Sequence, residues 1–208
     1  MRRLVLATRN TKKISELERI LQAAGLTDVE LAGPEIYAAL PDIPETGLTF
    51  AENSLIKARA VAQATGLPAI ADDSGLCVDA LNGMPGVLSA RWSGRFGDDP
   101  NGPGRDLSNL HLVLDQVADV PDTHLGANFT CAATLTLPDG TEHVVEGVVV
   151  GHLVRAPRGD GGFGYDPIFV PEGETRTTAE MSAAEKDAIS HRGRAFRALV
   201  PLLKQLAE

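Results

Sequence analysis

The chain has 208 residues, 43% of them hydrophobic, which is long enough for one compact domain with its own core. Its 19 lysines and arginines stand against 28 aspartates and glutamates, a net charge of -9, which excludes a basic field for general binding of DNA or RNA. The apolar run at the N-terminus, Leu4 to Ala7, is far shorter than a signal-peptide core of about 7 to 15 residues, and no stretch of about 18 apolar residues occurs. We therefore expect no membrane association.

The cysteine and aromatic contents narrow the class further. Cys77 and Cys131 lie far apart in the sequence and neither belongs to a CxxC motif, which favours a reduced, cytoplasmic protein over a disulfide scaffold or a zinc site. Aromatic residues make up only 4% of the chain, so aliphatic side chains must form the core.

The first third of the chain predicts two strands and two helices. Leu4 to Ala7 reads as a buried strand, and the helical spacing of Ile14, Leu17 and Ile20 predicts a helix that Gly25 ends. A connection marked by prolines follows. Its prolines are Pro34, Pro41 and Pro44.

A second helix is predicted by Thr49, which stands three residues before Glu52 and so forms a capping box; we expect this helix to run to about Thr65. Ala69 to Ala71 then form a short apolar strand. Asp72 and Asp73 are expected where this strand ends.

The rest of the chain alternates between helices and strands. Pro138 to Thr141 is a strong hairpin signal, and Ser182 with Glu185 is another capping box. The expected elements are a surface loop at 94–104, a helix at 107–117, strands at 129–137 and 144–150, and a C-terminal helix to Leu206 with a kink or break near Pro201. Because a hairpin requires antiparallel pairing, the fold class is α/β with a mixed sheet.

Five stretches carry candidate chemistry, and each has an ordinary structural alternative. The loop after the first strand brings hydroxyls, an amide and cations to a helix N-terminus, where anions bind; the alternative is a solvated surface charge, and GxxxxGK[ST] is absent. Its residues are Thr8, Arg9, Asn10, Thr11, Lys12 and Lys13.

Two adjacent carboxylates, Asp72 and Asp73, precede Ser74 and Gly75 at the end of a buried strand. A cation such as Mg²⁺ would compensate them, whereas the alternative is a turn in which one aspartate caps nearby backbone. Upstream, Asn53 and Lys57 share one helical face after the loop that carries Glu45. That face is a functional candidate or a merely solvated surface.

Near the C-terminus, Phe163, Gly164, Tyr165 and Asp166 follow a glycine-rich run, so a flat ligand could stack on an aromatic ring there; the alternative is that Phe163 or Tyr165 packs back into the core. Further on, a cluster of donors and cations surrounds the start of the last helix, for which surface solvation is the alternative. It comprises Lys186, His191, Arg192 and Arg194.

In order, the sequence contains TxNxxK from Thr8, ETGLTFxEN from Glu45, KAR from Lys57, DDSGL from Asp72, then GxPGVxSAR, FGYDPxF and ISHRGRA. Each motif is weak alone, but in this order they resemble the inosine and xanthosine triphosphate pyrophosphatase family. The resemblance runs from Thr8 to about Ala195.

The resemblance implies an elongated mixed β-sheet flanked by helices, a single domain over 1–208, a homodimer, and Mg²⁺-dependent hydrolysis of ITP, dITP and XTP to the monophosphate and pyrophosphate. It leaves open a division into two lobes with the active site in the cleft between them. By this resemblance Glu45 and Asp73 are metal ligands, Asp72 is a candidate third ligand, and Asp73 is the general base. The substrate-binding residues would be Thr8, Arg9, Asn10, Thr11, Lys12, Lys13, Lys57, Ser74, Phe163, Gly164, Tyr165, Asp166, Lys186, His191 and Arg192.

Two departures from the family pattern are visible. Ser108-Asn109-Leu110-His111 stands where an Asn-Asn pair followed by Lys is usual, and Asp187 stands where Asn often follows Lys186. Two other functions remain open: a pyrophosphatase of the septum-formation-inhibitor type acting on pyrimidine or modified nucleotides, and a module that senses nucleotides without hydrolysing them.

Overall fold

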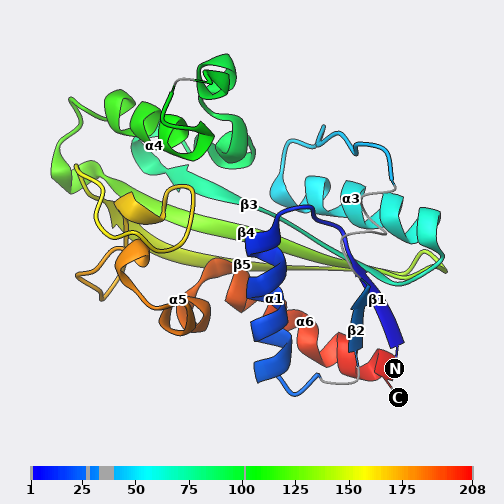
Figure 1. Cartoon of the computed structure of the whole chain (residues 1–208). Helices are drawn as coiled ribbons and strands as arrows, with labels where there is room; N and C mark the ends of the chain where they lie inside the picture. The colour runs from blue at the N-terminus through cyan, green and yellow to red at the C-terminus, as the bar shows by residue number, and fades with distance from the viewer. Residues whose placement is uncertain (1, 27–28, 33–39, 101, 208) are drawn as a thin grey trace. The chain divides into compact units, whose positions relative to one another are not determined.

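The computed structural model describes residues 2–26, 29–32, 40–100 and 102–207 (Figure 1). Helices and strands alternate along the chain, with short 3-10 turns between several of them. The elements are β1 (Arg2–Leu6), α1 (Thr11–Ala23), β2 (Val29–Ala32), α3 (Phe50–Thr65), β3 (Ala69–Val78), α4 (Arg105–Gln116), β4 (Gly126–Thr136), β5 (Glu142–Leu153), β6 (Phe169–Pro171), α5 (Ala183–Ile189) and α6 (His191–Ala207). Pro34 of the predicted connection lies outside the described residues.

The strands of the described chain form one sheet in the order β2-β1-β3-β4-β5-β6. β1 pairs in parallel with both β2 and β3, and β5 pairs antiparallel with β6. At the predicted hairpin, the Leu137 N–H donates to the Thr141 carbonyl (2.9 Å), and Gly140 adopts a φ of 90°. The predicted α/β class with a mixed sheet is confirmed.

The chain divides into two compact units. The first unit comprises Met1–Asp73, Cys131–Gly147 and His191–Glu208, and the second comprises Ser74–Thr130 and Val148–Ser190. Three of the four divisions fall inside β3, β4 and β5, and the fourth falls between α5 and α6.

The core of the first unit is aliphatic. α1 presents Leu17, Ile20 and Leu21 to it, and α1 contacts α6, as Figure 1 shows. α3 buries Ala58 and Val61 in a second cluster with β1 and the start of β3. Small and branched side chains let these helices lie close to the parallel strands, which therefore read as continuous apolar runs.

The helix boundaries follow the capping signals. Thr49 and Glu52 form the predicted capping box at the start of α3, and Gly66 ends that helix with a φ of 67°. Ser182 and Glu185 form the second predicted box, at the start of α5.

Two boundary predictions need correction. Of the predicted kink or break near Pro201, the break is wrong because Pro201 lies inside α6, while the kink stays a prediction. The break is at Ser190, whose extended backbone separates α5 from α6. Likewise β3 does not stop at Ala71 but continues through Asp72 and Asp73 to Val78. The buried aspartates stay in the strand because cations and amides compensate them, as described below.

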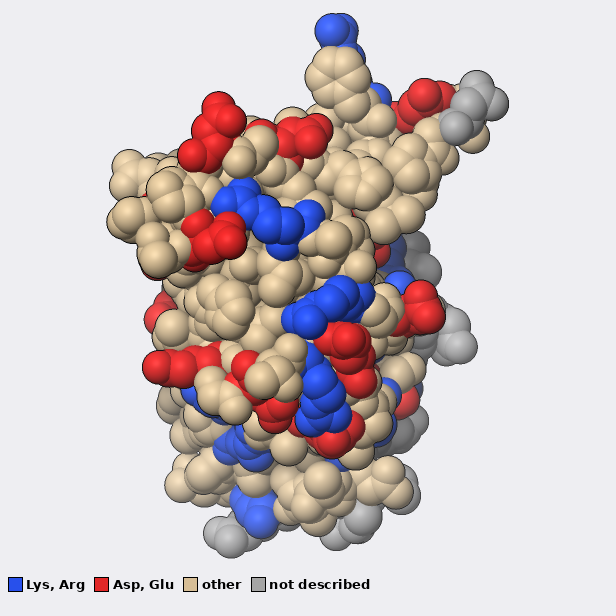
Figure 2. Space-filling model, turned by 90° about the vertical axis from the view of Figure 1, so that its left-hand side faces the viewer, with Lys and Arg blue, Asp and Glu red and all other residues tan. Residues whose placement is uncertain are grey.

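The second unit has its own core around α4, β6, the end of β3, the start of β4 and the end of β5. In this core Phe129 and Phe169 meet edge to face with ring centroids 4.8 Å apart. Within the described residues, no helix is both long and apolar enough to cross a membrane. On the face in Figure 2, basic and acidic side chains are interspersed, in keeping with the absence of a basic field.

Candidate functional site

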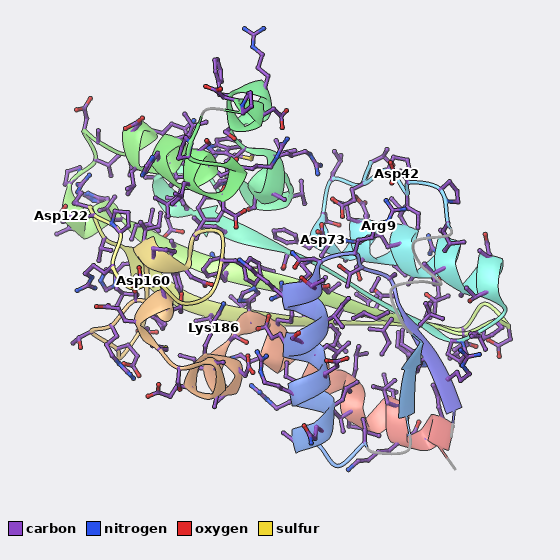
Figure 3. The ribbon with its side chains drawn as sticks, viewed as in Figure 1. Arg9, Asp42, Asp73, Asp122, Asp160 and Lys186 are labelled. Atoms are coloured by element: carbon purple, nitrogen blue, oxygen red, sulfur yellow. The ribbon has the colours of Figure 1, made fainter. Side chains whose placement is uncertain are left out.

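The loop between β1 and α1 is organised by its own side chains. The Asn10 side chain caps α1 by accepting from the backbone N–H groups of Lys12 (3.0 Å) and Lys13 (3.3 Å), and the Thr8 hydroxyl accepts from the Asn10 N–H (3.2 Å). Arg9 is exposed and pairs with Asp42, as the labels in Figure 3 allow the reader to follow. Thr11 is the first residue of α1, next to the exposed Lys12.

Asp72 lies at the edge where this loop leaves the parallel strands, because Leu6 of β1 pairs with Ile70 of β3. Its Oδ2 atom accepts from the Lys13 Nζ (2.9 Å) and from the Arg192 Nε (3.2 Å). Arg192, 2% exposed, also pairs through Nη1 with the buried Glu16 at 2.5 Å. Four charged groups from β3, α1 and α6 thus form one buried chain.

Asp73 belongs to a second charged cluster, with α3 and the loop before it. Lys57 Nζ lies 2.7 Å from Glu45 Oε1 and 3.6 Å from Asp73 Oδ1. Asn53 donates to the other Asp73 oxygen (3.1 Å) while its own oxygen accepts from the Gly47 N–H (2.8 Å), so it ties the loop that carries Glu45 to α3. The shared helical face of Asn53 and Lys57 is therefore buried, not solvated.

The two aspartates experience opposite electrostatics. Burial works to raise the pKa of Asp72, but Lys13 and Arg192 outweigh it and hold that pKa well below its ordinary value. Burial also raises the pKa of Asp73, and there Lys57 does not fully offset it, partly because Glu45 adds a like charge. Burial lowers the pKa of Lys57, yet the surrounding carboxylates, Asp73 first, raise it overall.

The oxygen donors around Lys57 suit a hard cation. Among the described residues, no group of three or more His, Cys, Asp or Glu side chains is placed to hold a metal ion. Mg²⁺ requires less, because it usually takes one or two carboxylates together with water and substrate phosphates. Glu45 and Asp73, which already share one ammonium group, supply that pair, whereas Asp72 has two cations of its own.

In the second unit, Asp166 binds several residues in and around the loop at 163–166, which is called the aromatic loop below. Its buried carboxylate accepts from the Phe163 N–H (2.8 Å), the Thr178 hydroxyl (2.9 Å) and the Lys186 Nζ (2.6 Å). Lys186, labelled in Figure 3, also lies over the Phe163 ring, 5.0 Å from its centroid. Lys186 is therefore an ion-pair partner as well as a candidate donor.

The two aromatic residues of this loop differ in burial. Tyr165 is 4% exposed, packs in the second unit's core, and donates its hydroxyl to the Ser89 carbonyl (2.8 Å). Phe163 is only partly buried. Of the two residues that could pack back into the core, it is Tyr165 that does so, and Phe163 stays the candidate for stacking.

The remaining predicted residues are placed as follows. Ser74 is partly buried in β3, Gly164 follows Phe163 with a φ of 62°, and His191 is buried at the first position of α6. Asn109, which follows the departing Ser108, has a structural contact: its side chain is 2% exposed and accepts from both the N–H and the hydroxyl of Ser93, each at 2.7 Å. Asp187 is partly buried on α5.

Sequence reasoning missed Glu16 and Asp106. Glu16 lies three residues after Lys13 and four before Ile20, so a carboxylate stands on the inward stripe of α1, and that misplaced charge was the available signal. Asp106, in the first turn of α4, accepts from the Gly164 N–H (3.1 Å), and nothing in the sequence indicates that contact.

Comparison with known proteins gives consistent matches over almost the whole chain. Residues 4–202 match the Ham1 family. A dITP/XTP pyrophosphatase from Streptomyces coelicolor is 63% identical over 206 residues, covering 99% of each chain. One from Mycobacterium tuberculosis is 54% identical over 205 residues, covering 99% of this chain and 97% of the relative.

Solved structures agree with these matches. A HAM1 protein from Coxiella burnetii superposes with a TM-score of 0.85 at 40% identity, covering 99% of this chain and 100% of its own. A nucleoside-triphosphatase, also named dITP/XTP pyrophosphatase, from Mycobacterium abscessus gives a TM-score of 0.75 at 51% identity, covering 97% and 99%.

Proposed function

Because this chain belongs to the Ham1 family, we propose that it hydrolyses the non-canonical purine nucleotides dITP, XTP and ITP to the nucleoside monophosphate and pyrophosphate. Its relatives carry the name of such an enzyme, and it is a nucleoside triphosphate pyrophosphatase in the same sense. The observation in the structure that carries the proposal is the pair of lysines, Lys13 and Lys57, set against Asp72, Asp73 and Glu45.

The two lysines would allow this acidic protein to bind a highly charged triphosphate. A nucleoside triphosphate brings about four negative charges to a protein whose own net charge is -9, so cations must be concentrated locally. Lys13 and Lys57 are fixed by carboxylates behind them, so their ammonium groups need little reorganisation when phosphate oxygens bind. Arg9 and Lys12, in the same loop, would add to this attraction.

Glu45 and Asp73 would hold Mg²⁺. Asp72 would instead remain paired with Lys13 and Arg192. When bound, the metal supplies positive charge to the phosphate oxygens on which negative charge grows in the transition state. Asn53 orients Asp73 for this, because its amide already holds one of the two Asp73 oxygens.

The hydrolytic step would use Asp73 as general base. A water oxygen forms a bond to the α-phosphorus while its proton passes to the Asp73 carboxylate, and the bond between the α-phosphorus and the bridging oxygen breaks, releasing pyrophosphate. Burial raises the pKa of Asp73, which makes the carboxylate a better proton acceptor than an exposed aspartate. This role comes from the family resemblance.

Base selection would depend on hydrogen-bond donors. Keto-purines carry an acceptor, O6, where adenine carries an amino group, so a pocket of donors discriminates against ATP. Phe163 would supply the stacking face, and Lys186, His191 and Arg192 are the candidate donors by resemblance. The partners of Arg192, Asp72 and Glu16, give it a second role in holding Asp72.

A turnover panel tests the proposal. Pyrophosphate release would be measured with Mg²⁺ and dITP, XTP, ITP, ATP, GTP and TTP, with Asp73→Asn as the inactive control. Preference for the first three supports the proposal. Preference for a pyrimidine nucleotide would instead favour the septum-formation-inhibitor type, and binding without turnover would favour a sensing module.

A homodimer and a cytoplasmic location complete the proposal. Sedimentation at micromolar concentration tests the homodimer.

A further inference from the structure

Two carboxylates hold the backbone at Phe163. One binds the N–H group before the Phe163 Cα, and the other binds the N–H group after it. Asp166 accepts from the N–H of Phe163 itself (2.8 Å), and Asp106 accepts from the N–H of the next residue, Gly164 (3.1 Å). These two N–H groups belong to the peptide planes that flank the Phe163 Cα. Holding both planes restricts φ and ψ of Phe163, and with them the direction of its ring.

The two carboxylates come from different parts of the sequence. Asp166 belongs to the aromatic loop and is 3% exposed, with Thr178 and Lys186 as further partners. Asp106 lies 58 positions away from Gly164, in the first turn of α4, and it is exposed. Asp106 is thus the one that ties the loop to a helix elsewhere in the second unit.

Gly164 is the residue whose backbone needs such a tie. Its φ of 62° lies in the left-handed region, which glycine enters and leaves at little steric cost. The peptide plane after Phe163 has two hydrogen bonds: its carbonyl oxygen accepts from the Asp166 N–H (3.3 Å), and its N–H donates to Asp106 (3.1 Å). Loss of Asp106 would leave only the longer of the two. Tyr165 anchors the loop one residue later through its hydroxyl, but that bond holds a side chain and does not hold the plane between Phe163 and Gly164.

We propose that Asp106 is a positioning residue for base selection: its carboxylate holds the Gly164 N–H and so orients the Phe163 ring toward a stacked nucleobase. This inference rests on the proposed function for its substrate. The competing explanation is that Asp106 serves α4 alone, as an acidic residue near a helix N-terminus.

The test compares Asp106→Ala with Asp106→Asn in the full chain, with Asp115→Ala as a control that removes an exposed carboxylate from the same helix. An asparagine oxygen still accepts a hydrogen bond but carries no charge, so only the positioning role survives in that variant. Three quantities are measured: kcat and KM for dITP, the amide proton shift and exchange rate of Gly164 by NMR without substrate, and Tm.

We expect Asp106→Ala to raise KM for dITP by about 10-fold, as the loss of one bond to a charged acceptor predicts, with kcat changed by less than about twofold. The Gly164 amide should shift and exchange faster. Asp106→Asn should restore KM to within about threefold of the wild-type value, and Asp115→Ala should change neither KM nor the Gly164 amide.

Equal KM increases in Asp106→Ala and Asp106→Asn, or an unchanged Gly164 amide in Asp106→Ala, would overturn the inference in favour of a helix-charge role. If the wild-type chain does not turn over dITP, the proposed function fails. The Gly164 amide, read without substrate, still decides whether Asp106 holds the loop.

Discussion

The two units hold their candidate functional side chains by different interactions. The charged clusters of the first unit bring Lys13, Lys57 and Arg192 to within 3.6 Å of carboxylates that are buried or partly buried. The aromatic loop of the second unit is held by the buried ion pair between Lys186 and Asp166 and by carboxylates that accept from backbone N–H groups. Phosphate is a diffuse, highly charged group that any nucleotide presents, whereas a base is flat and distinguished by single donors and acceptors.

This contrast explains where rigidity is located. In the first unit, removal of one partner leaves a buried charge without compensation, so the geometry is enforced by electrostatics. In the second, removal of a hydrogen bond leaves the loop free to relax. Substitutions in the charged clusters should therefore affect stability. Those at Lys13 should slow all substrates alike, whereas those at the candidate base donors should change the choice among substrates.

The largest expected effect is on stability, at Arg192. Arg192→Ala leaves Asp72 and Glu16 without their shared guanidinium group, which should lower the free energy of unfolding by about 3 to 5 kcal/mol in urea titrations. Arg197→Ala, which removes an exposed arginine from the same helix, should change it by less than about 0.5 kcal/mol. Equal stability in the two variants would contradict the buried ion pairs.

The same Arg192→Ala variant also examines its base-reading role. If Arg192 donates to O6 in addition to holding Asp72, the ratio of kcat/KM for ITP over ATP falls in the fraction that remains folded. If it only holds Asp72, both substrates slow alike and the ratio is unchanged.

Next in size is the chemical step. Asp73→Asn keeps a similar shape and its contact with Asn53 but weakens both the general base and the metal site, so kcat should fall by at least about 10²-fold while circular dichroism stays native. Turnover close to the wild-type value would remove Asp73 from the mechanism.

A pair of lysine variants tests whether phosphate binding and base selection depend on different residues. Lys13→Ala removes a contact to a group common to every nucleotide, so kcat/KM should fall for ITP and ATP by the same factor. Lys186→Ala should instead lower the preference for ITP over ATP by roughly 10-fold, because it removes a candidate donor and the partner of Asp166. Equal loss of both substrates in Lys186→Ala would show that the second unit does not select the base.

The sequence could predict those features of the structure that depend on residues close together in the chain. The capping boxes at Thr49 and Ser182 and the hairpin at Gly140 depend on neighbouring residues, and all three are confirmed. The α/β class follows from the alternation of such elements, and it is confirmed as well. The family also follows from ordered motifs, and the matches confirm it.

The errors arise where distant residues decide. β3 was expected to end at its first aspartate because buried carboxylates are unfavourable, but Lys13 and Arg192, far away in the chain, remove that penalty. β2 was not anticipated because four residues give too little pattern. Asp106 was missed because its partner is a backbone N–H, which no side-chain motif records.

The smallest expected effect is on the free energy of unfolding, at a buried hydroxyl group. Among the described residues, the Thr136 hydroxyl alone is a buried side-chain polar atom without a hydrogen-bond partner. Thr134 lies two positions earlier on the same face of β4, and its hydroxyl accepts from Ser54 at 2.7 Å. Valine has nearly the shape of threonine, so the two sites form a matched pair.

Thr136→Val removes a desolvated hydroxyl that has no partner, so the free energy of unfolding should rise by about 1 kcal/mol, whereas Thr134→Val removes a made hydrogen bond and should lower it by about 1 kcal/mol. Urea titration of both variants against wild type measures the difference, which is about 2 kcal/mol between them and larger than either change alone. If Thr136→Val destabilises the protein as much as Thr134→Val, the Thr136 hydroxyl has a partner in solution, and the first unit matches its buried polar groups without exception.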